Sequence, residues 1–362
     1  MQPGSGVQIM LLSVGLAQYI DFVRRTFGRY LTDDIAREIL DSPEGLHLGG
    51  QHRFVTIMMT DLRGFTSMCG KMDPADVVKL LNHYLEAMTR IIMKYGGTID
   101  EFIGDAILVV FGAPVQHDHE ELRAVACAIE MLNAMEAVNE WNQDEGLPVV
   151  EMGIGTHSGD VVVGNIGSEM RAKFGIVGAT INMTSRVESC TVGGQVLISE
   201  ATRQRCGEAL TLGSSQSLSL KGVQGTLEVH EVLAVGSPFD VRLDQAREDL
   251  APPAHHLAFR FAVVKGKNVG ELTESAVAVT LSKLGAEIRV AGTLEALSNL
   301  QLRVVGEDGS LHAGDLYAKV LRAGSEPGVF YVRWTSVPDV VQPILDRAIA
   351  PDPAVLGAPA AP

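Results

Sequence analysis

The chain has 362 residues, of which 46% are hydrophobic and 20% charged, and a formal net charge of −15. The length accommodates more than one domain of ordinary size, and the composition excludes an intrinsically disordered chain. The negative charge argues against a surface for nucleic acid or anionic lipid, although bound divalent metals still allow an anionic substrate. The four cysteines include no CxxC pair, so they indicate neither a zinc site nor a disulfide framework, and a cytoplasmic location is expected.

Residues 1–50 are predicted to form a helical linker or dimerisation segment. Apolar side chains recur at helical spacing over 18–40, which is typical of a helix that pairs with a partner or packs on its own domain. The candidate membrane stretch, 7–23, contains Gln8, Gln18 and Asp21 and follows no Lys or Arg. It is short for a span and lacks the basic start of a signal peptide, so a pairing helix is favoured, while membrane association through the N-terminus stays open.

Two strand-and-turn units place carboxylates at strand ends. The apolar run Phe54–Met59 predicts a strand that leads to Asp61 and a glycine turn. Thr98–Ile103 and Ala106–Phe111 predict a hairpin with Asp105 at its tip. If these strands are neighbours, the two carboxylates converge beside backbone amides that can face a phosphate. Such oxygen ligands are what Mg²⁺ or Mn²⁺ on a nucleotide requires.

Two helices are predicted from their caps and apolar faces. Asp73–Pro74 begins the first, and Gly96–Gly97 ends it. The second is predicted to start near Asp118 and to run to about Trp141, because Glu121 stands three residues after Asp118, the spacing of a capping box. The two flanking histidines are interpreted as solvated cap residues rather than metal ligands.

Further strands and one helix are predicted in the following segment. Strands are expected at 149–156 and 161–165, around a turn at 157–160, and a helix at 180–190. Closing strands are predicted at 195–199, 216–220 and 227–233. The glycines here do not form GxGxxG, and the chain has no GxxxxGK[ST], so neither a dinucleotide fingerprint nor a Walker loop is supported.

Taken together, these motifs resemble the catalytic domain of class III nucleotidyl cyclases, the adenylyl and guanylyl cyclases. TDLRGFT, EFIGDAILVVFG, GIGTHSGDVVVGNIGS and GATINMTSRVES stand in the family's order and at its spacing, and the resemblance extends over residues 28–235. It implies an α+β, ferredoxin-like catalytic domain, placed at 51–235.

The resemblance also implies the roles of particular residues. Asp61, Asp105 and the backbone carbonyl of Leu62 match the ligands of two divalent ions, Mg²⁺ or Mn²⁺. Asn182 and Arg186 match the pair that positions the ribose and stabilises charge on the α-phosphate. The implied phosphate-binding residues are Arg63, Gly64, Phe65 and Thr66, through backbone amides, then Lys221 and, as a weaker candidate, Arg171.

The purine-binding positions favour guanine. Guanylyl cyclases carry Glu four residues before the second metal-binding Asp, as this chain does at Glu101, whereas adenylyl cyclases carry Lys. A carboxylate accepts hydrogen bonds from both donors on the Watson–Crick edge of guanine. Seven residues before Asn182 stands Gly175, which has no side chain to read the amine of adenine and leaves room for O6 of guanine.

The sequence therefore predicts a guanylyl cyclase that converts GTP to 3′,5′-cyclic GMP and pyrophosphate in a two-fold homodimer. An adenylyl cyclase acting on ATP and a catalytically inactive cyclase-like domain are the alternatives. One position departs from the family pattern: Ala179 stands where Asp or Asn is usual, and we interpret this as the loss of a structural hydrogen bond.

The rest of the chain is divided into a linker at 236–256, a small β-barrel at 257–347 and a disordered tail at 348–362. Barrel strands are expected at 276–281, 286–290, 300–305, 317–321 and 329–335. This part weakly resembles PilZ domains, but Thr280 replaces their Asp or Asn, and Arg260 alone remains of their arginine pair. An interaction barrel without a ligand is therefore favoured, and the barrel and the N-terminal helix are the candidate surfaces for a regulatory protein.

Overall fold

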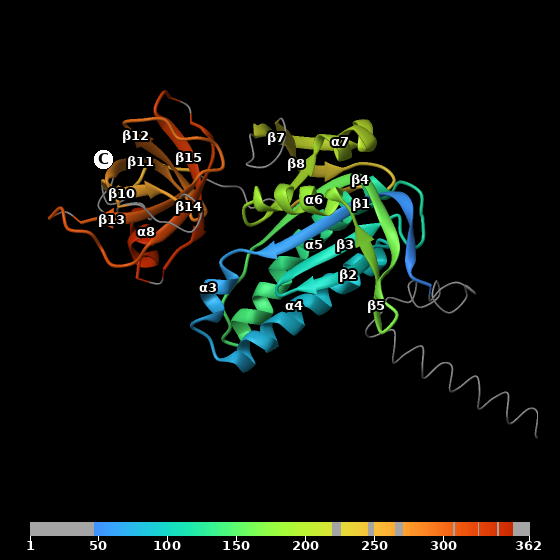
Figure 1. Ribbon diagram of the computed structural model, residues 1–362. Coiled ribbons are helices and arrows are strands. Elements are labelled where there is room, and N and C mark those ends of the chain that lie inside the picture. The colour runs from blue at the N-terminus through green and yellow to red at the C-terminus, as the bar shows by residue number, and fades with distance from the viewer. Residues whose placement is uncertain are drawn as a thin grey trace, which may run out of the picture.

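The computed structural model describes residues 47–218, 226–244, 250–264, 271–306, 308–324, 326–338 and 340–349. The helix expected at 18–40, Lys221 and the part of the predicted tail from 350 onward lie outside these residues. The first two residues of that tail, 348 and 349, are helical rather than disordered. The described chain forms a twisted sheet with flanking helices and, beside it, a closed barrel (Figure 1). Among the described helices, none has both the length and the hydropathy needed to cross a membrane.

Four strands form the centre of the sheet: β1 (Gly49–Leu62), β2 (Thr98–Ile103), β3 (Ala106–Phe111) and β4 (Met152–Ser168). Their spatial order is β2-β3-β1-β4, with every neighbouring pair antiparallel. Helix α4 (Pro74–Lys94) connects β1 with β2, and α5 (Glu120–Asp144) connects β3 with β4. These are two interleaved split βαβ units, so the predicted ferredoxin-like arrangement is confirmed.

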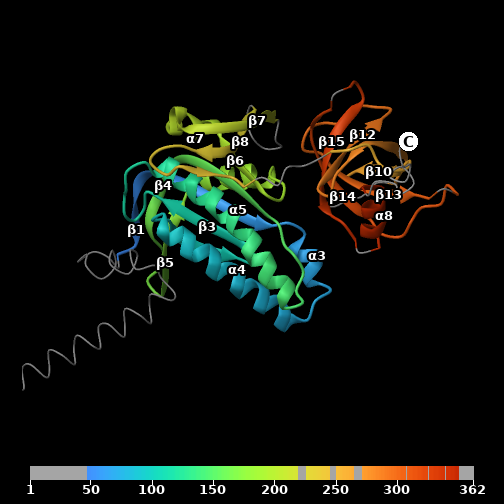
Figure 2. The same ribbon diagram turned by 180° about the vertical axis from the view of Figure 1, so that it is seen from behind.

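Both faces of the central strands are covered, which explains why they are continuously apolar rather than alternating. Met58 belongs to the core beneath α4 and α5, whereas Ile57, its neighbour in sequence, belongs to the core on the opposite face. Figure 2 shows α4 and α5 side by side along the first of these faces. On α4, the buried side chains lie at helical spacing, at Leu80, Tyr84, Met88 and Ile92.

The remaining elements extend the sheet beyond β4. Strands β6 (Gln195–Ser199), β8 (Leu227–Val235) and β7 (Leu210–Leu218) follow in that spatial order, while β5 (Arg171–Val177) pairs with β4. Helix α7 (Glu200–Cys206) and β5 were not predicted from the sequence. Within the predicted linker, β9 (Val241–Arg242) pairs with β8, so this part of the linker adds to the sheet.

The turn predicted at 157–160 is wrong, because β4 runs unbroken through these residues. They pair with β1 in continuous register, from Ile57 opposite His157 to Phe54 opposite Asp160. The short polar residues resemble a turn in composition, but Ser158 lies inside the sheet, where its hydroxyl is 2.9 Å from that of Thr56. Pairing across a long neighbouring strand overrides local turn propensity here.

The second long helix starts near Asp118 as predicted, but its cap is not the expected one. His119, not Asp118, is the N-cap of α5; its φ is 60° and its side chain makes no capping hydrogen bond. The carboxylate of Glu120 instead accepts from the backbone N–H of His117. The capping-box spacing in the sequence is therefore coincidental.

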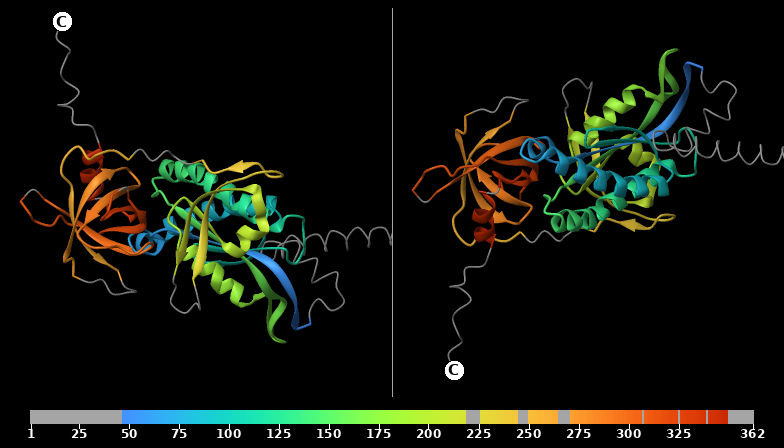
Figure 3. Two further views of the ribbon diagram at one scale, coloured as in Figure 1. Left: turned by 90° about the horizontal axis from the view of Figure 1, so that it is seen from above. Right: turned by 90° about the horizontal axis from the view of Figure 1, so that it is seen from below.

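The C-terminal region forms a closed six-stranded barrel, ordered β10-β11-β12-β15-β14-β13. Its strands are β10 (Ala258–Val263), β11 (Glu274–Leu281), β12 (Gly285–Val290), β13 (Asn299–Val305), β14 (Leu316–Ala323) and β15 (Val329–Ser336). The expected barrel is confirmed, with β10 as an unpredicted sixth strand, and α8 (Gln342–Ile349) packs Leu345 against its core. Figure 3 shows the barrel beside the short helix α3 (Phe65–Cys69). The PilZ resemblance stays a prediction.

The side chain of His157 gives a test of the corrected strand. Its Nδ1 lies 2.7 Å from Ser199 Oγ, and burial lowers its pKa to about 4 from 6.5. Because the unfolded chain binds the proton more tightly, the free energy of unfolding should fall as the pH drops from 6.5 to 4, by up to about 3 kcal/mol.

Chemical denaturation across this pH range checks this expectation. A His157→Asn variant, which keeps a polar atom near Nδ1 but has no titrating group, should show a flatter pH dependence than the wild type. Parallel curves for the two proteins would contradict a buried, neutral His157.

Candidate active site

The carboxylates of Asp61 and Asp105 meet where β1 ends beside the β2–β3 hairpin. The backbone N–H of Leu62 donates a 2.9 Å hydrogen bond to Asp105 Oδ2, and β1 pairs directly with β3 up to Thr60. The pKa of Asp61 is raised to about 7, first by burial and then by the charges of Glu188 and Asp105, with Arg63 opposing. The structure thus brings together the two carboxylates that the sequence pointed to.

This donor set fits a divalent cation. Burial is the larger cause of the raised pKa of Asp61, and the charges of Glu188 and Asp105 add to it. Two carboxylates held side by side and partly removed from water repel each other. A bound Mg²⁺ or Mn²⁺ would offset the repulsion between the two carboxylates. Carboxylate and carbonyl oxygens are the ligands that these ions prefer. Asp61 is 39% exposed, so the site opens to solvent.

The side chain of Arg63 connects the carboxylate pair to helix α6 (Ala179–Ser189). Its Nη1 lies 3.5 Å from Asp61 Oδ2, and its Nη2 pairs with Glu188 and donates a 2.7 Å hydrogen bond to Thr191 Oγ1. From the sequence, only the backbone of Arg63 was predicted to take part, and Glu188 was not predicted. The acidic residue within the NMTSRVES motif is the signal that could have indicated Glu188.

The phosphate-facing turn forms only in part as predicted. Gly64 is left-handed, with φ 69°, and starts α3, where Phe65 is buried and Thr66 is exposed. The N–H of Arg63, however, donates to the carbonyl of Glu151 at 2.8 Å, so that amide is already occupied. The available turn therefore comprises the residues after Arg63.

Arg171 does not lie near this turn within one chain. It pairs with Ser168 at one end of β4, whereas Asp61 pairs with Gly153 at the other. At about 3.3 Å per residue, the two ends lie tens of ångströms apart along the strand. Arg171 and Asp61 thus lie at opposite ends of β4 within one chain, and the phosphate-binding role of Arg171 stays a prediction.

Helix α6 lies directly on β4 because one face of that strand has no side chains at three positions. A Cβ at Gly153 would meet Thr191 and Arg63, one at Gly155 would meet the backbone of Glu188, and one at Gly159 would meet Thr180. These positions are separated by even numbers of residues, so they share one face of the strand. The GIGTHSG motif is therefore a seat for a helix rather than a nucleotide loop.

Asn182 and Arg186 stand one helical turn apart on α6. Asn182 is exposed, and Arg186 is partly buried. The N-cap of α6 is Gly178, which has no side chain that could cap the helix, and Ala179 is the first helical residue. The C-terminal end of α6 continues to Glu188, which pairs with Arg63 beside Asp61.

The predicted purine residues lie next to a cation that the sequence analysis missed. Lys173 Nζ is 3.1 Å from Glu101 Oε2 and 2.9 Å from Asp100 Oδ2. The space beside Gly175, expected to be free for O6 of guanine, holds the carboxylate of Asp100. Had β5 been predicted, period-2 alternation would have placed Lys173 on the same face as Gly175.

The barrel contacts the end of α6. Lys319, on β14, is 6% exposed and donates hydrogen bonds to the carbonyls of Ser189 at 2.8 Å and Thr191 at 3.1 Å. Burial lowers the pKa of Lys319 to about 8. A lysine at a helix C-terminus satisfies carbonyls that have no partner in the helix.

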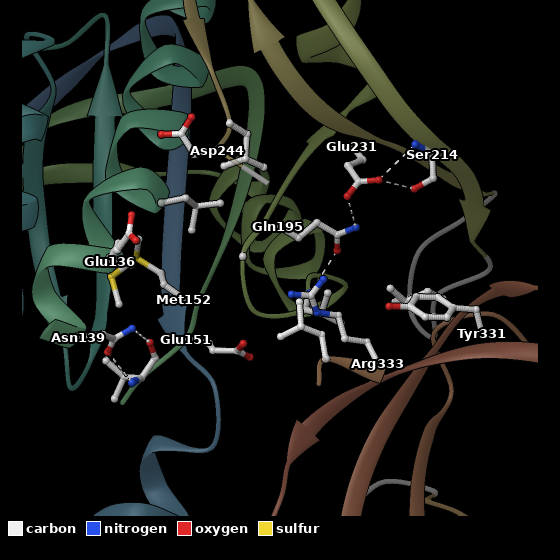
Figure 4. Close-up of a pocket in the computed structure, with 18 of the residues that line it drawn as sticks. Glu136, Asn139, Glu151, Met152, Gln195, Ser214, Glu231, Asp244, Tyr331 and Arg333 are labelled. Atoms are coloured by element: carbon white, nitrogen blue, oxygen red, sulfur yellow. Dashed lines mark hydrogen bonds between the residues drawn. The ribbon is translucent and has the colours of Figure 1, made fainter. Parts of the chain in front are cut away.

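A cavity of about 710 Å³ lies between the sheet and the barrel (Figure 4). On the sheet side, Glu231 accepts hydrogen bonds from Gln195 at 3.1 Å and from the hydroxyl of Ser214 at 2.9 Å. Arg333 of β15 and Glu151 also line it. Asp61 and Asp105 are not among its lining residues, so this cavity is separate from the carboxylate pair.

Elsewhere in the described ranges, the residues Glu200, Glu228 and His230 form the one group of three potential metal ligands. The carboxylate of Glu200 is bound by the guanidinium of Arg203 at 2.5 and 2.7 Å, which lowers its pKa to about 2. The guanidinium of Arg203 therefore already supplies a positive charge to this group, which is distinct from the site at Asp61.

Comparison with known proteins agrees with this geometry. Residues 49–234 match the family described as "Adenylate and Guanylate cyclase catalytic domain". The solved structure of the guanylyl cyclase Cya2 has 47% sequence identity with this chain and a TM-score of 0.53. The match covers 54% of this chain and 100% of that one. The adenylyl cyclase CyaB from P. aeruginosa is 31% identical, with a TM-score of 0.50, over the same shares.

A curated relative, "Adenylate cyclase" of Anabaena cylindrica, is 35% identical over 191 residues, which are 50% of this chain and 37% of that protein. The chain spans about a third of the length of the curated relatives that it matches first.

The bridge between Arg63 and Glu188 predicts a large loss of stability when it is broken. Their side chains are 14% and 10% exposed, so Arg63→Met leaves a mostly buried carboxylate without its ion-pair partner. We expect a loss of about 2–4 kcal/mol, and recovery of most of it in Arg63→Met with Glu188→Met.

Denaturant unfolding of the full chain measures both variants. Arg90→Met is the matched control, because the ion pair of Arg90 with Glu86 is exposed and its loss should cost less than about 0.5 kcal/mol. If the double variant is as unstable as the single one, the bridge is not the source of the loss.

Proposed function

The chain belongs to the adenylate and guanylate cyclase catalytic-domain family, and we propose that it is a guanylyl cyclase. It would convert GTP to 3′,5′-cyclic GMP and pyrophosphate. The observation that carries the reaction type is the convergence of Asp61 and Asp105, whose repulsion calls for divalent cations. The observation that favours guanine is Glu101, a carboxylate at the position that reads the purine edge.

The proposed site uses the chain's own groups in separate tasks. Asp61, Asp105 and the carbonyl of Leu62 hold two divalent ions, Mg²⁺ or Mn²⁺, which supply activation of the ribose 3′-hydroxyl and neutralise phosphate charge. Asn182 orients the ribose. Arg186 donates to the α-phosphate oxygens as their charge grows in the transition state.

The remaining contacts select and hold the substrate. Glu101 accepts from N1–H and the N2 amine of guanine. Backbone amides from Gly64 to Thr66 face the phosphates, and Lys221, outside the described residues, is proposed to grip the terminal ones.

The proposal includes a homodimer with two equivalent sites. In the family that the chain resembles, one catalytic domain contributes the aspartates and the other contributes the asparagine, arginine and purine-reading residues. This chain carries all of them, so two copies related by a two-fold axis complete two sites. Such a site would also give the exposed Asn182 a function across the interface.

An adenylyl cyclase is the second candidate, and the named adenylate cyclases among the relatives are the observation that favours it. The inactive cyclase-like alternative has less support, because Asp61, Asp105, Asn182 and Arg186 are all present. The contact of Lys319 with the end of α6 supports the barrel as a regulatory surface. A cytoplasmic location and the division into domains are part of the same proposal.

The reaction is tested by incubating the purified full chain with GTP or ATP and Mn²⁺ and measuring the cyclic nucleotide formed. We expect cyclic GMP as the main product. Asp61→Ala or Asp105→Ala should abolish it without unfolding the chain, because each removes an ion ligand at a partly exposed position.

Thermal unfolding of the same preparations shows whether each variant is folded. Near-normal turnover by either variant would overturn the metal assignment. Equal or faster turnover of ATP by the wild type would promote the adenylyl cyclase alternative.

The shared site is tested by mixing inactive chains. Asn182→Ala or Arg186→Ala should each lower kcat by roughly 10²–10³-fold. When Asp61→Ala and Arg186→Ala chains are mixed in equal amounts, half of the dimers are mixed and each mixed dimer has one intact site. Activity should recover to about a quarter of the wild-type value.

Heterodimers purified through two different affinity tags provide the control for subunit exchange. No recovery in such verified heterodimers would count against a site shared between chains.

A further inference from the structure

Strand β2 contains a bulge at the point where two acidic residues follow one another. The register against β3 shifts between Ile99 and Glu101, so Asp100 is the extra residue. Consecutive side chains of a regular strand point to opposite faces, and a bulge redirects them. As a result, both Asp100 and Glu101 reach the ammonium group of Lys173, at 2.9 and 3.1 Å.

The three charged groups differ in how firmly they are held. Asp100 is 9% exposed, whereas Glu101 is 54% and Lys173 49% exposed. Burial raises the pKa of Asp100, while its hydrogen bonds with Lys173 and with the backbone of Ile176 act to lower it. Asp100 is therefore held by both Lys173 and the backbone of Ile176. The more exposed Glu101 is connected to Asp100 through Lys173.

Gly175 provides the space in which Asp100 lies. A Cβ at this position would lie 2.9 Å from Asp100 Oδ1, closer than real Cβ atoms approach other atoms. Gly175 is not among the glycines with positive φ, so its backbone conformation does not require glycine. The glycine is instead explained by the carboxylate that occupies the adjoining space.

We propose that Asp100, seated beside Gly175, is a positioning residue that holds Lys173 against Glu101 and so fixes the carboxylate that reads guanine. The inference rests on the proposed function, in which Glu101 accepts two hydrogen bonds from the purine. An exposed Glu side chain has several rotamers, and two-point recognition requires one of them. Anchoring it through Lys173 removes that entropic cost before the nucleotide binds.

The experiment compares Asp100→Ala and Gly175→Ala in the full chain. Each variant is assayed for kcat and KM with GTP and with ATP, and the dissociation constants of both nucleotides with Mn²⁺ are measured by calorimetry. We expect the GTP-to-ATP ratio of kcat/KM to fall about tenfold in both variants, mainly through a higher KM for GTP. Gly175→Ala should act this way because it displaces the Asp100 carboxylate.

The double variant distinguishes positioning from general damage. Once Asp100 is removed, a methyl group at position 175 displaces nothing, so the double variant should lose no more selectivity than Asp100→Ala alone. Glu86→Ala removes an exposed carboxylate on α4 and should leave the ratio unchanged. A folding defect lowers turnover of both nucleotides equally and does not move the ratio.

Two outcomes overturn the inference: an unchanged ratio in Asp100→Ala, or additive losses in the double variant. If the wild type binds GTP but forms no cyclic nucleotide, the proposed function fails, and the ratio of binding constants still decides the role of Asp100. If the wild type binds neither nucleotide, both proposals are overturned.

Discussion

Helix α6 rests on the backbone of β4 because three glycines on one face of that strand put no side chains between them. This close approach places Glu188 of α6 within reach of Arg63, which follows the last residue of β1. A methyl group at Gly155 alone would meet the backbone of the helix, which cannot turn aside as a side chain can. The position of α6, which carries Asn182 and Arg186, relative to Asp61 and Asp105 therefore depends on glycines that have no Cβ atom.

The negative charges around this contact are partly offset by cations from two parts of the molecule. Asp61, Asp105 and Glu188 bring negative charge to one partly buried region, and Arg63 and Lys319 bring positive charge to it. Arg63 follows the end of β1 in the sheet, whereas Lys319 comes from the barrel. Buried carboxylates keep their charge only where such partners or metal ions are present. The surplus of negative charge at Asp61 is what makes the region suited to cations.

The sequence was most informative where an apolar run ends in a sharp turn. Three strands have the predicted bounds, because both the hydrophobic pattern and the flanking turn residues define them. They are β2 (Thr98–Ile103), β3 (Ala106–Phe111) and β6 (Gln195–Ser199). The same reasoning predicted that Asp61 and Asp105 lie close together, since the strand ends that carry them belong to neighbouring strands.

Features that depend on pairing between distant segments were not predictable in this way. Strand β4 continues through His157 because β1 is long enough to pair with it, and no local pattern records the length of a partner. The same limit applies to Lys173, whose partners lie about 70 residues earlier in the chain. The bulge at Asp100 is likewise a property of the ladder rather than of the acidic pair itself.

The contact between the barrel and α6 joins the matched family domain to the chain that follows it. The family match ends at residue 234, yet two carbonyls at the end of α6 are bonded to a lysine 85 residues beyond that boundary. Apolar contacts cross the same boundary, because Leu297 packs against the cluster that contains Val187. A protein cut at the boundary would hydrate those carbonyls and uncover that cluster. The end of α6 and the barrel therefore complete each other, and the folded unit extends past the end of the family match.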